Sequence, residues 1–89
     1  MQVPVRLRLT VRFFAAARAA AGTETQTIDL PAGATLADLL DKLVETRGTG
    51  LATVLARCSY LCDGIAVRDR EMTLVDAQTI DVLPPFAGG

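Results

Sequence analysis

The beginning of the chain alternates strictly between apolar and polar side chains. Valine, leucine or phenylalanine occupies every odd position over residues 3–13, whereas the even positions over residues 2–12 are polar or proline. A period of two is typical of a β-strand that buries one face, and on a helix the arginines of this segment would not share one side. We therefore predict that the chain opens with a strand rather than with a basic targeting helix. Such a strand needs other elements to cover its apolar face.

The most regular helical pattern begins at Thr35. Thr35 followed by Asp38 has the spacing of a capping box, and Gly48 supplies a stop signal. Between them apolar residues recur at helical spacing, namely Leu36, Leu39, Leu40, Leu43 and Val44. Burial of these side chains would contribute about 8–15 kcal/mol gross, so we expect this helix to cover the sheet.

Two shorter elements are expected between the first strand and this helix. Residues 14–21 are rich in alanine and precede Gly22, which favours one or two helical turns with a glycine stop. Residues 25–30 carry threonine and acid in alternation with apolar side chains, and Pro31 follows them. This pattern predicts a second strand, antiparallel to the first.

The second half of the chain predicts further strands. Asp63 and Gly64 form a strong hairpin signal between residues 59–62 and residues 65–67. Residues 79–83 are expected to form the last strand, and a right-handed crossover would place it beside the first strand and parallel to it.

The order of these elements predicts one α+β domain over residues 1–83, with a mixed sheet packed on one main helix. One face of the sheet would stay free. Two segments remain open from the residues alone. Residues 51–57 fit a short helix or an irregular crossing, and residues 72–75 fit a short strand or a turn.

Composition excludes several classes of function. The 89 residues contain no histidine, which removes the commonest general base and the commonest metal ligand. Nine Lys plus Arg against ten Asp plus Glu give a formal net charge of −1, which argues against a nucleic-acid binder. No apolar run approaches the ~20 residues that a membrane-spanning helix needs.

The two cysteines indicate no metal or redox site. Cys58 and Cys62 lack the spacing of zinc or thioredoxin-like motifs, so we expect no bound metal. We predict two half-buried thiols in a reducing, cytoplasmic compartment rather than a disulfide.

Residues 84–89 follow the last predicted strand directly and have the composition of an extended tail. Pro84 and Pro85 cannot extend a hydrogen-bonded ladder, so the chain is expected to leave the sheet stiff. Gly88 and Gly89 lack Cβ atoms and would give a thin, flexible end with a free carboxylate. Such a tail can enter a channel too narrow for side chains. The alternative is an inert end, since chain termini are often rich in glycine.

Three groups of residues match a known pattern. After the first strand the chain reads Phe13-Phe14-Ala15, then Arg18, then Gly22-Thr23, and the leucine-rich helix begins at Thr35. The chain ends Pro84-Pro85-Phe86-Ala87-Gly88-Gly89. These motifs resemble those of the ubiquitin-like β-grasp sulfur carriers of the ThiS and MoaD type, and above all the family of molybdopterin synthase small subunits. The ending is specific to the family, whereas the helix pattern alone is not.

The chain departs from the family pattern at two places. Asp76-Ala77-Gln78 stands where the family often has Asp-Gly-Asp before the last strand, which affects the turn. Phe86 replaces a smaller apolar residue, so the pocket of the partner would be wider or the partner different. A large aromatic on a solvated tail favours docking in a partner, and the alternative is that Phe86 folds back onto the core of its own domain.

The resemblance implies a two-stage activation at Gly89. A ubiquitin-activating-like (MoeB-like) adenylyltransferase would use ATP to convert the Gly89 carboxylate into a glycyl adenylate. A persulfide donor would then displace AMP and leave a thiocarboxylate, 1-thioglycine. A carboxylate is a poor electrophile, and the mixed anhydride supplies a leaving group. No cofactor is expected on this chain itself.

The resemblance also implies a partner. The loaded tail, comprising Pro84, Pro85, Phe86, Ala87 and Gly88 before Gly89, would insert into the large (MoaE-like) subunit of molybdopterin synthase. Two small and two large subunits would form a heterotetramer, in which the sulfur builds the dithiolene of molybdopterin. Phe14 and Leu83 are predicted to face this partner. The acid–base groups are expected on the large subunit, which makes the present chain a carrier without catalysis of its own.

Three other functions fit the same residues. The chain could carry sulfur for thiamine or cysteine biosynthesis on the same scaffold, or modify proteins through isopeptide bonds at Gly89. A third alternative is an interaction module with an inert tail. A standalone enzyme is the least favoured, since no nucleophile–base pair is visible in the sequence.

Overall fold

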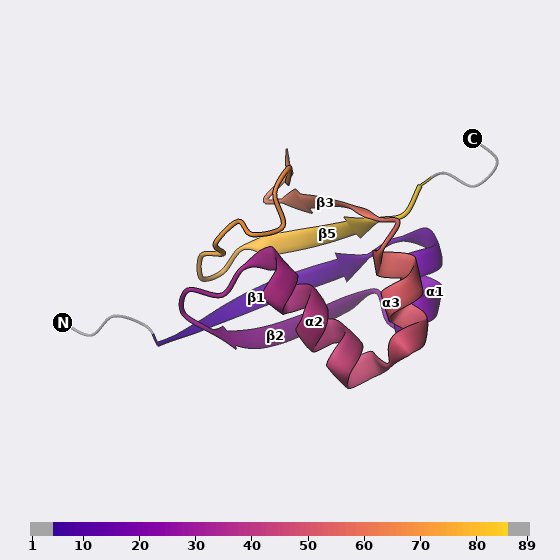
Figure 1. Ribbon diagram of the computed structural model, residues 1–89, viewed down its shortest axis with the longest axis horizontal. Helices are drawn as coiled ribbons and strands as arrows, with labels where there is room; N and C mark the ends of the chain where they lie inside the picture. Colours follow the sequence, from indigo (N-terminus) through magenta and orange to yellow (C-terminus); the bar gives the residue numbers. More distant parts are fainter. Residues whose placement is uncertain (1–4, 86–89) are drawn as a thin grey trace.

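The computed structural model describes residues 5–85, which form a five-stranded sheet with helices on one face and at one end (Figure 1). The strands are β1 (Arg6–Phe13), β2 (Thr25–Pro31), β3 (Ser59–Cys62), β4 (Ile65–Ala66) and β5 (Thr79–Leu83). The helices are α1 (Ala15–Ala21), α2 (Leu36–Arg47) and α3 (Thr49–Leu55). The strand order is β2-β1-β5-β3-β4, with β1 and β5 parallel and the other pairs antiparallel. This is the mixed sheet that the sequence predicted.

Strand β1 lies inside the sheet and pairs with both β2 and β5. Its odd residues from Leu7 to Phe13 are buried, whereas Arg6, Arg8 and Arg12 are exposed on the opposite face. The period of two therefore predicted the buried side correctly. Ile80 and Val82 of β5 are fully buried beside it, so the parallel pair forms the middle of the core.

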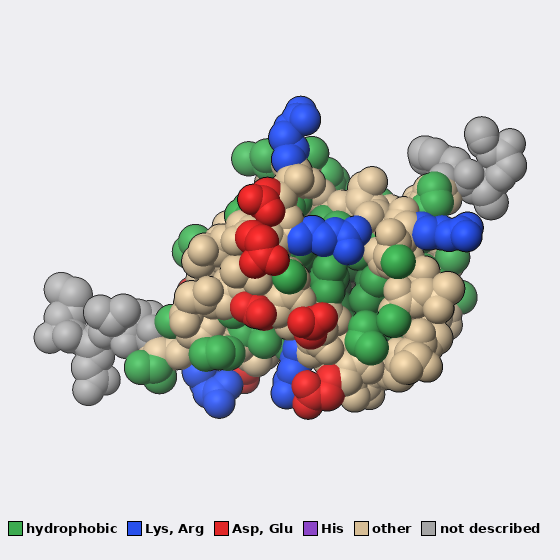
Figure 2. Space-filling model, in the orientation of Figure 1, with side chains coloured by type: hydrophobic (Ala, Val, Ile, Leu, Met, Phe, Trp, Pro, Cys, Tyr) green, Lys and Arg blue, Asp and Glu red, His purple; other side chains and the backbone are tan. Residues whose placement is uncertain are grey.

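Helix α2 covers the sheet, as its leucine pattern indicated. Thr35 accepts a hydrogen bond from the Asp38 backbone N–H while the Asp38 carboxylate accepts one from the Thr35 N–H, so the predicted capping box is present. Leu36, Leu39 and Leu43 are fully buried. Figure 2 shows acidic side chains grouped over α2 and the loop beside it, so the face of the molecule that carries α2 is charged.

The structure decides the two segments that the sequence left open. Residues 49–55 form α3, which lies beside α1 and α2 and buries Leu51 and Leu55. Residues 72–75 form no strand. They make only an isolated bridge between Thr73 and Thr35, which ties the loop to the start of α2.

Two turns show how short sequence signals translate into backbone geometry. Asp63 and Gly64 both have positive φ, 49° and 83°, as the predicted two-residue hairpin requires. Ala77 also has a positive φ of 69°, so alanine adopts here the conformation for which the related pattern uses glycine. The turn is retained because the Ala77 N–H donates to the Arg8 carbonyl at 3.0 Å.

The prediction of half-buried cysteines was wrong in degree. Cys58 and Cys62 are free thiols, each only 7% exposed. Cys62 shares the buried side of β3 with Tyr60, and Cys58 is buried directly before this strand. The sequence did not reveal how completely α3 and the sheet enclose this side. Among residues 5–85, no helix is long and apolar enough to cross a membrane.

Candidate functional site

The candidate site lies where the chain leaves β5. Leu83, the last residue of this strand, is half-buried, as is Pro84, whereas Pro85 is exposed. Neither proline belongs to a strand or helix, in agreement with their inability to extend a ladder. Phe86, Ala87, Gly88 and Gly89 lie outside the described residues. The structure therefore describes the start of the predicted tail, Leu83 to Pro85, which we call the tail root.

Phe14 lies at the same end of the sheet as this root. It follows β1 directly and precedes α1 with an extended backbone, φ −122° and ψ 150°. Its N–H donates to the carbonyl of Val82 at 3.3 Å, which joins it to the residue before Leu83. The residue remains 39% exposed. The two predicted partner-facing residues, Phe14 and Leu83, are thus brought together by the parallel pairing of β1 and β5.

Arg12 and Asp81 form an ion pair beside Phe14. The guanidinium donates from Nε to Oδ1 at 2.6 Å and from Nη2 to Oδ2 at 2.9 Å, so the contact is bidentate. The two residues are direct neighbours in the register of β1 and β5. The hydrogen bond to Asp81 raises the pKa of the Arg12 guanidinium above its ordinary value. The guanidinium carbon lies 5.6 Å from the centre of the Phe14 ring, within the range of a cation–π contact.

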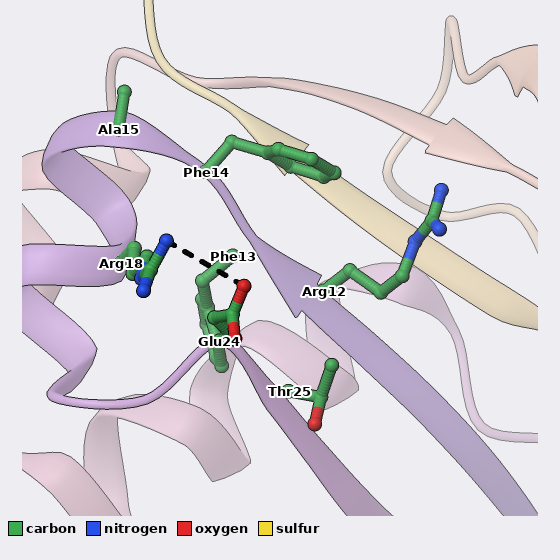
Figure 3. Close-up of a pocket in the computed structure, with 7 residues that line it drawn as sticks. All are labelled: Arg12, Phe13, Phe14, Ala15, Arg18, Glu24 and Thr25. Atoms are coloured by element: carbon green, nitrogen blue, oxygen red, sulfur yellow. Dashed lines mark ion pairs between the residues drawn. The ribbon is translucent and has the colours of Figure 1, made fainter.

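A hollow of about 460 Å³ opens next to this group (Figure 3). It is lined by residues from the end of β1, the start of α1 and the start of β2: Arg12, Phe13, Phe14, Ala15, Arg18, Glu24 and Thr25. Arg18 and Glu24 pair across it at 3.5 Å. Ala15 has a φ of 48°, a conformation that costs free energy in a residue with a Cβ. A backbone under strain at this position shows that the turn after Phe14 is held by its surroundings.

Arg47, the last residue of α2, makes hydrogen bonds to α1 and β2 near this end of the sheet. Its Nη1 donates to the Ala21 carbonyl at the end of α1 at 2.6 Å, and its Nε donates to the Gln26 side chain of β2. The guanidinium carbon lies 6.0 Å from the centre of the buried Phe13 ring. One side chain at the end of α2 thereby ties α1 to β2.

Sequence reasoning missed Arg12, Asp81 and Arg47. Arg12 was one of several solvent-facing arginines, and nothing in the pattern set it apart. Asp81 is the only acid in the last predicted strand, and the expected parallel pairing with the first strand was a signal that could have placed it opposite an arginine. Arg47 carried no such signal, because its contacts depend on the packing of α2 against α1.

Tyr60, Cys58 and Cys62 are buried, and none of them lines the hollow. The Tyr60 hydroxyl donates to the Leu55 carbonyl at 2.7 Å, and burial raises the pKa of Tyr60 to about 12. Burial likewise raises the pKa of the Cys58 and Cys62 thiols, which keeps them neutral and poorly nucleophilic. Within the described part of the chain, no three His, Cys, Asp or Glu side chains gather as a metal site needs. What this end of the sheet offers is an exposed aromatic residue beside a hollow, close to the point where the chain leaves β5.

Comparison with known proteins gives this surface a context. A family model described as the ThiS family matches residues 11–89, a range that includes both the Phe14 region and the terminal glycines. The chain belongs to the ThiS family. The molybdopterin synthase sulfur carrier subunit of Chlamydomonas reinhardtii is 30% identical over 84 residues, which cover 93% of this chain and 100% of that protein.

Solved structures agree with this membership. A complex of subunits 1 and 2 of the molybdopterin-converting factor from Helicobacter pylori contains a chain that is 25% identical, with a TM-score of 0.66. The match covers 93% of this chain and 100% of that one. Small archaeal modifier protein 1 from Methanosarcina acetivorans is 26% identical with a TM-score of 0.79, over 94% of this chain and 98% of that one. The fold is therefore the ubiquitin-like β-grasp.

Proposed function

We propose that this chain is the sulfur-carrier subunit of a molybdopterin synthase. The observation that carries the proposal is the exposed Phe14, hydrogen-bonded to Val82 at the end of β5 from which the tail leaves, in a ThiS-family chain that ends in Gly88 and Gly89. The 30% identity to a molybdopterin synthase sulfur carrier subunit supports this branch of the family. A carrier needs one reactive end and one surface for its partners, and this chain provides both.

The chemistry would take place at the carboxylate of Gly89. In the first step a carboxylate oxygen attacks the α-phosphorus of ATP on an activating enzyme, pyrophosphate leaves and a glycyl adenylate forms. In the second step the outer sulfur of the donor persulfide attacks the acyl carbon and AMP leaves, which gives an acyl disulfide. A second thiolate then attacks the donor's own sulfur, forms a disulfide with it and releases the thiocarboxylate at Gly89. ATP is bound by the activating partner, and the carrier contributes the acyl group.

The large subunit of the synthase would be the partner at the tail root. The solved Helicobacter pylori complex pairs a chain similar to this one with a second subunit of the molybdopterin-converting factor. In our proposal Phe14, Leu83 and Pro84 contact the large subunit, while Pro85, Phe86, Ala87 and Gly88 lead Gly89 into its active site. A heterotetramer of two small and two large subunits would result. The groups that move protons would belong to the large subunit, because the described residues of this chain offer buried, neutral thiols and no histidine.

The decisive experiment loads the tail with sulfur. The full chain is incubated with the activating enzyme from the same organism, ATP and a persulfide donor, and its intact mass is measured. We expect the mass change of one oxygen-to-sulfur exchange, located at Gly89 by fragmentation. A variant that lacks Gly88 and Gly89 is the matched control and should stay unchanged. An unmodified full chain, under conditions that load a known carrier, would contradict the proposal.

A second function is favoured by one specific observation. The similarity to small archaeal modifier protein 1 supports the alternative of a protein modifier that forms isopeptide bonds through Gly89. Affinity purification under denaturing conditions separates the two. A modifier yields covalent adducts of higher mass, whereas a pure sulfur carrier yields the free chain. A carrier for thiamine or cysteine biosynthesis would instead copurify with the enzymes of that pathway.

A further inference from the structure

The face of the sheet opposite α2 carries two bidentate ion pairs. Arg12 pairs with Asp81 across β1 and β5, and Arg8 pairs with Asp29 across β1 and β2 at 3.0 and 3.4 Å. Both pairs join direct neighbours in the register of the sheet. They differ in their surroundings. The Arg8 and Asp29 side chains are 74% and 44% exposed, whereas Arg12 is 51% and Asp81 only 9% exposed.

The second difference is the aromatic ring. The Arg12 guanidinium carbon lies 5.6 Å from the centre of the Phe14 ring, and Figure 3 shows the ring and the Arg12 side chain extending toward the same region of the sheet. Among residues 5–85, Arg12, Arg47 and Arg70 lie over aromatic rings, whereas Arg8 lies over none. Of the two ion pairs, only Arg12–Asp81 therefore includes an arginine that contacts an aromatic ring.

The bidentate geometry restricts how the guanidinium can move. Two parallel hydrogen bonds to one carboxylate fix the plane of the arginine head, and the nearly buried Asp81 offers that carboxylate from a strand in the middle of the sheet. A cation fixed beside an aromatic ring limits the orientations of the ring. A chain of contacts thus runs from Asp81 on β5, the strand that leads into the tail, through Arg12 to the exposed Phe14 ring.

We propose that Arg12 and Asp81 are positioning residues that hold the Phe14 ring in the orientation in which it docks on the large subunit. The identity of the partner rests on the proposed function, whereas the restraint of the ring is a property of the free chain. Preorganisation of a contact residue lowers the entropy that binding loses. The partner group that fits this surface is an apolar side chain against the outer face of the ring, with an oxygen acceptor for the N–H groups that Arg12 does not direct to Asp81.

The test uses Asp81→Asn with Asp29→Asn as the matched control. Each substitution keeps the size and one oxygen acceptor but removes the charge that binds the arginine. The chain contains no tryptophan, so Phe14→Trp in each background gives a single fluorescent reporter at the position in question. We expect Asp81→Asn to increase the fast local rotation of this reporter, measured by time-resolved anisotropy, and Asp29→Asn to leave that rotation unchanged.

Affinity for the large subunit from the same organism, measured without the tryptophan, provides the second readout. We expect Asp81→Asn to weaken binding about five- to tenfold and Asp29→Asn to change it by less than about twofold. Arg12→Gln alters the half-exposed partner of the pair and should repeat the Asp81→Asn result, which keeps the test valid if Asp81→Asn destabilises the fold. Arg8→Gln is its control.

Two results would overturn the proposal. One is an unchanged rotation of the reporter in both Asp81→Asn and Arg12→Gln. The other is an equal loss of affinity in the variants of both ion pairs, which would show a general electrostatic effect. If the unmodified chain does not bind the large subunit at all, the proposed function fails, while the anisotropy still decides whether the ion pair restrains the ring.

Discussion

The two ends of β1 have similar polar contacts but differ in what those contacts support. Each end has a bidentate arginine–aspartate pair, and each has an alanine in the left-handed region close by, Ala15 after Phe14 and Ala77 beside Arg8. At the Arg8 end, hydrogen bonds tie β1 to the turn before β5. The Arg8 N–H donates to the Asp76 carboxylate at 2.7 Å, and the Arg8 carbonyl accepts a hydrogen bond from the Ala77 N–H. At the Arg12 end the chain leaves Phe14 exposed beside a hollow.

This difference shows what the polar contacts at each end support. At the Arg8 end they tie the turn that precedes β5 to β1, and the exposed apolar residues there, Val5 and Val75, are aliphatic. At the Arg12 end they support an aromatic ring at the surface. An exposed aromatic beside a hollow is typical of a protein–protein contact, whereas a hydrogen-bonded turn is typical of a structural connection.

The largest effect is expected for the exposed ring itself. Phe14→Ala should weaken binding to the large subunit about thirtyfold, because a central aromatic anchor commonly dominates an interface. Ile65→Ala is the control, since Ile65 is 73% exposed but lies on β4 at the edge of the sheet. Isothermal titration of both variants measures the effect. Equal losses of affinity would remove the distinction between the two surfaces.

A smaller effect is expected at the Arg8 end. Ala77→Gly removes the strain of a left-handed alanine, and this gain exceeds the entropy that glycine loses on folding. The melting temperature should rise by about 2–4 °C. Ala15→Gly should raise it less, because Ala15 begins α1 and glycine disfavours a helix. Thermal unfolding followed by circular dichroism measures both, and a lower melting temperature for Ala77→Gly would contradict the role assigned to strain.

The smallest effect is expected from the exposed ion pair, and it depends on pH. The hydrogen bond from Arg8 lowers the pKa of Asp29 below its ordinary value of 3.8. The stability contributed by the charged carboxylate is therefore present above that value and is lost as pH falls through the lowered pKa. Asp29→Asn should melt slightly below the unmodified chain at neutral pH, and the gap should close below pH 3.8. A gap that does not change with pH would show that the ion pair is not its source.

Much of the fold could be predicted because its signals are local. The alternation along β1, the capping box of Thr35 and Asp38, and the hairpin at Asp63 and Gly64 each depend on neighbouring residues, and each is present in the structure. The segment that became α3 could not be assigned, because seven residues carry too little periodicity to separate a helix from a loop. Its packing against α1 and α2 decided the matter.

The candidate site was only half predictable. Phe14 and Leu83 were named from the resemblance, and the structure brings them to one end of the sheet through the Phe14–Val82 hydrogen bond. Arg12 and Asp81 were not singled out, because they are 69 residues apart and meet only in the parallel pairing of β1 and β5. A pattern along the chain records which face a side chain occupies, but not which residue of a distant strand lies opposite.

The sequence by itself determined the buried face of β1, the limits of α2 and the type of the Asp63–Gly64 turn, because short-range sterics and hydrophobic periodicity act within a few residues. The proline and glycine residues of the tail are likewise plain in the sequence. Only the tertiary structure decided that Arg12 lies beside Phe14 and is held there by Asp81. That contact requires the register between two strands at opposite ends of the chain, and the register is set by how the whole core packs.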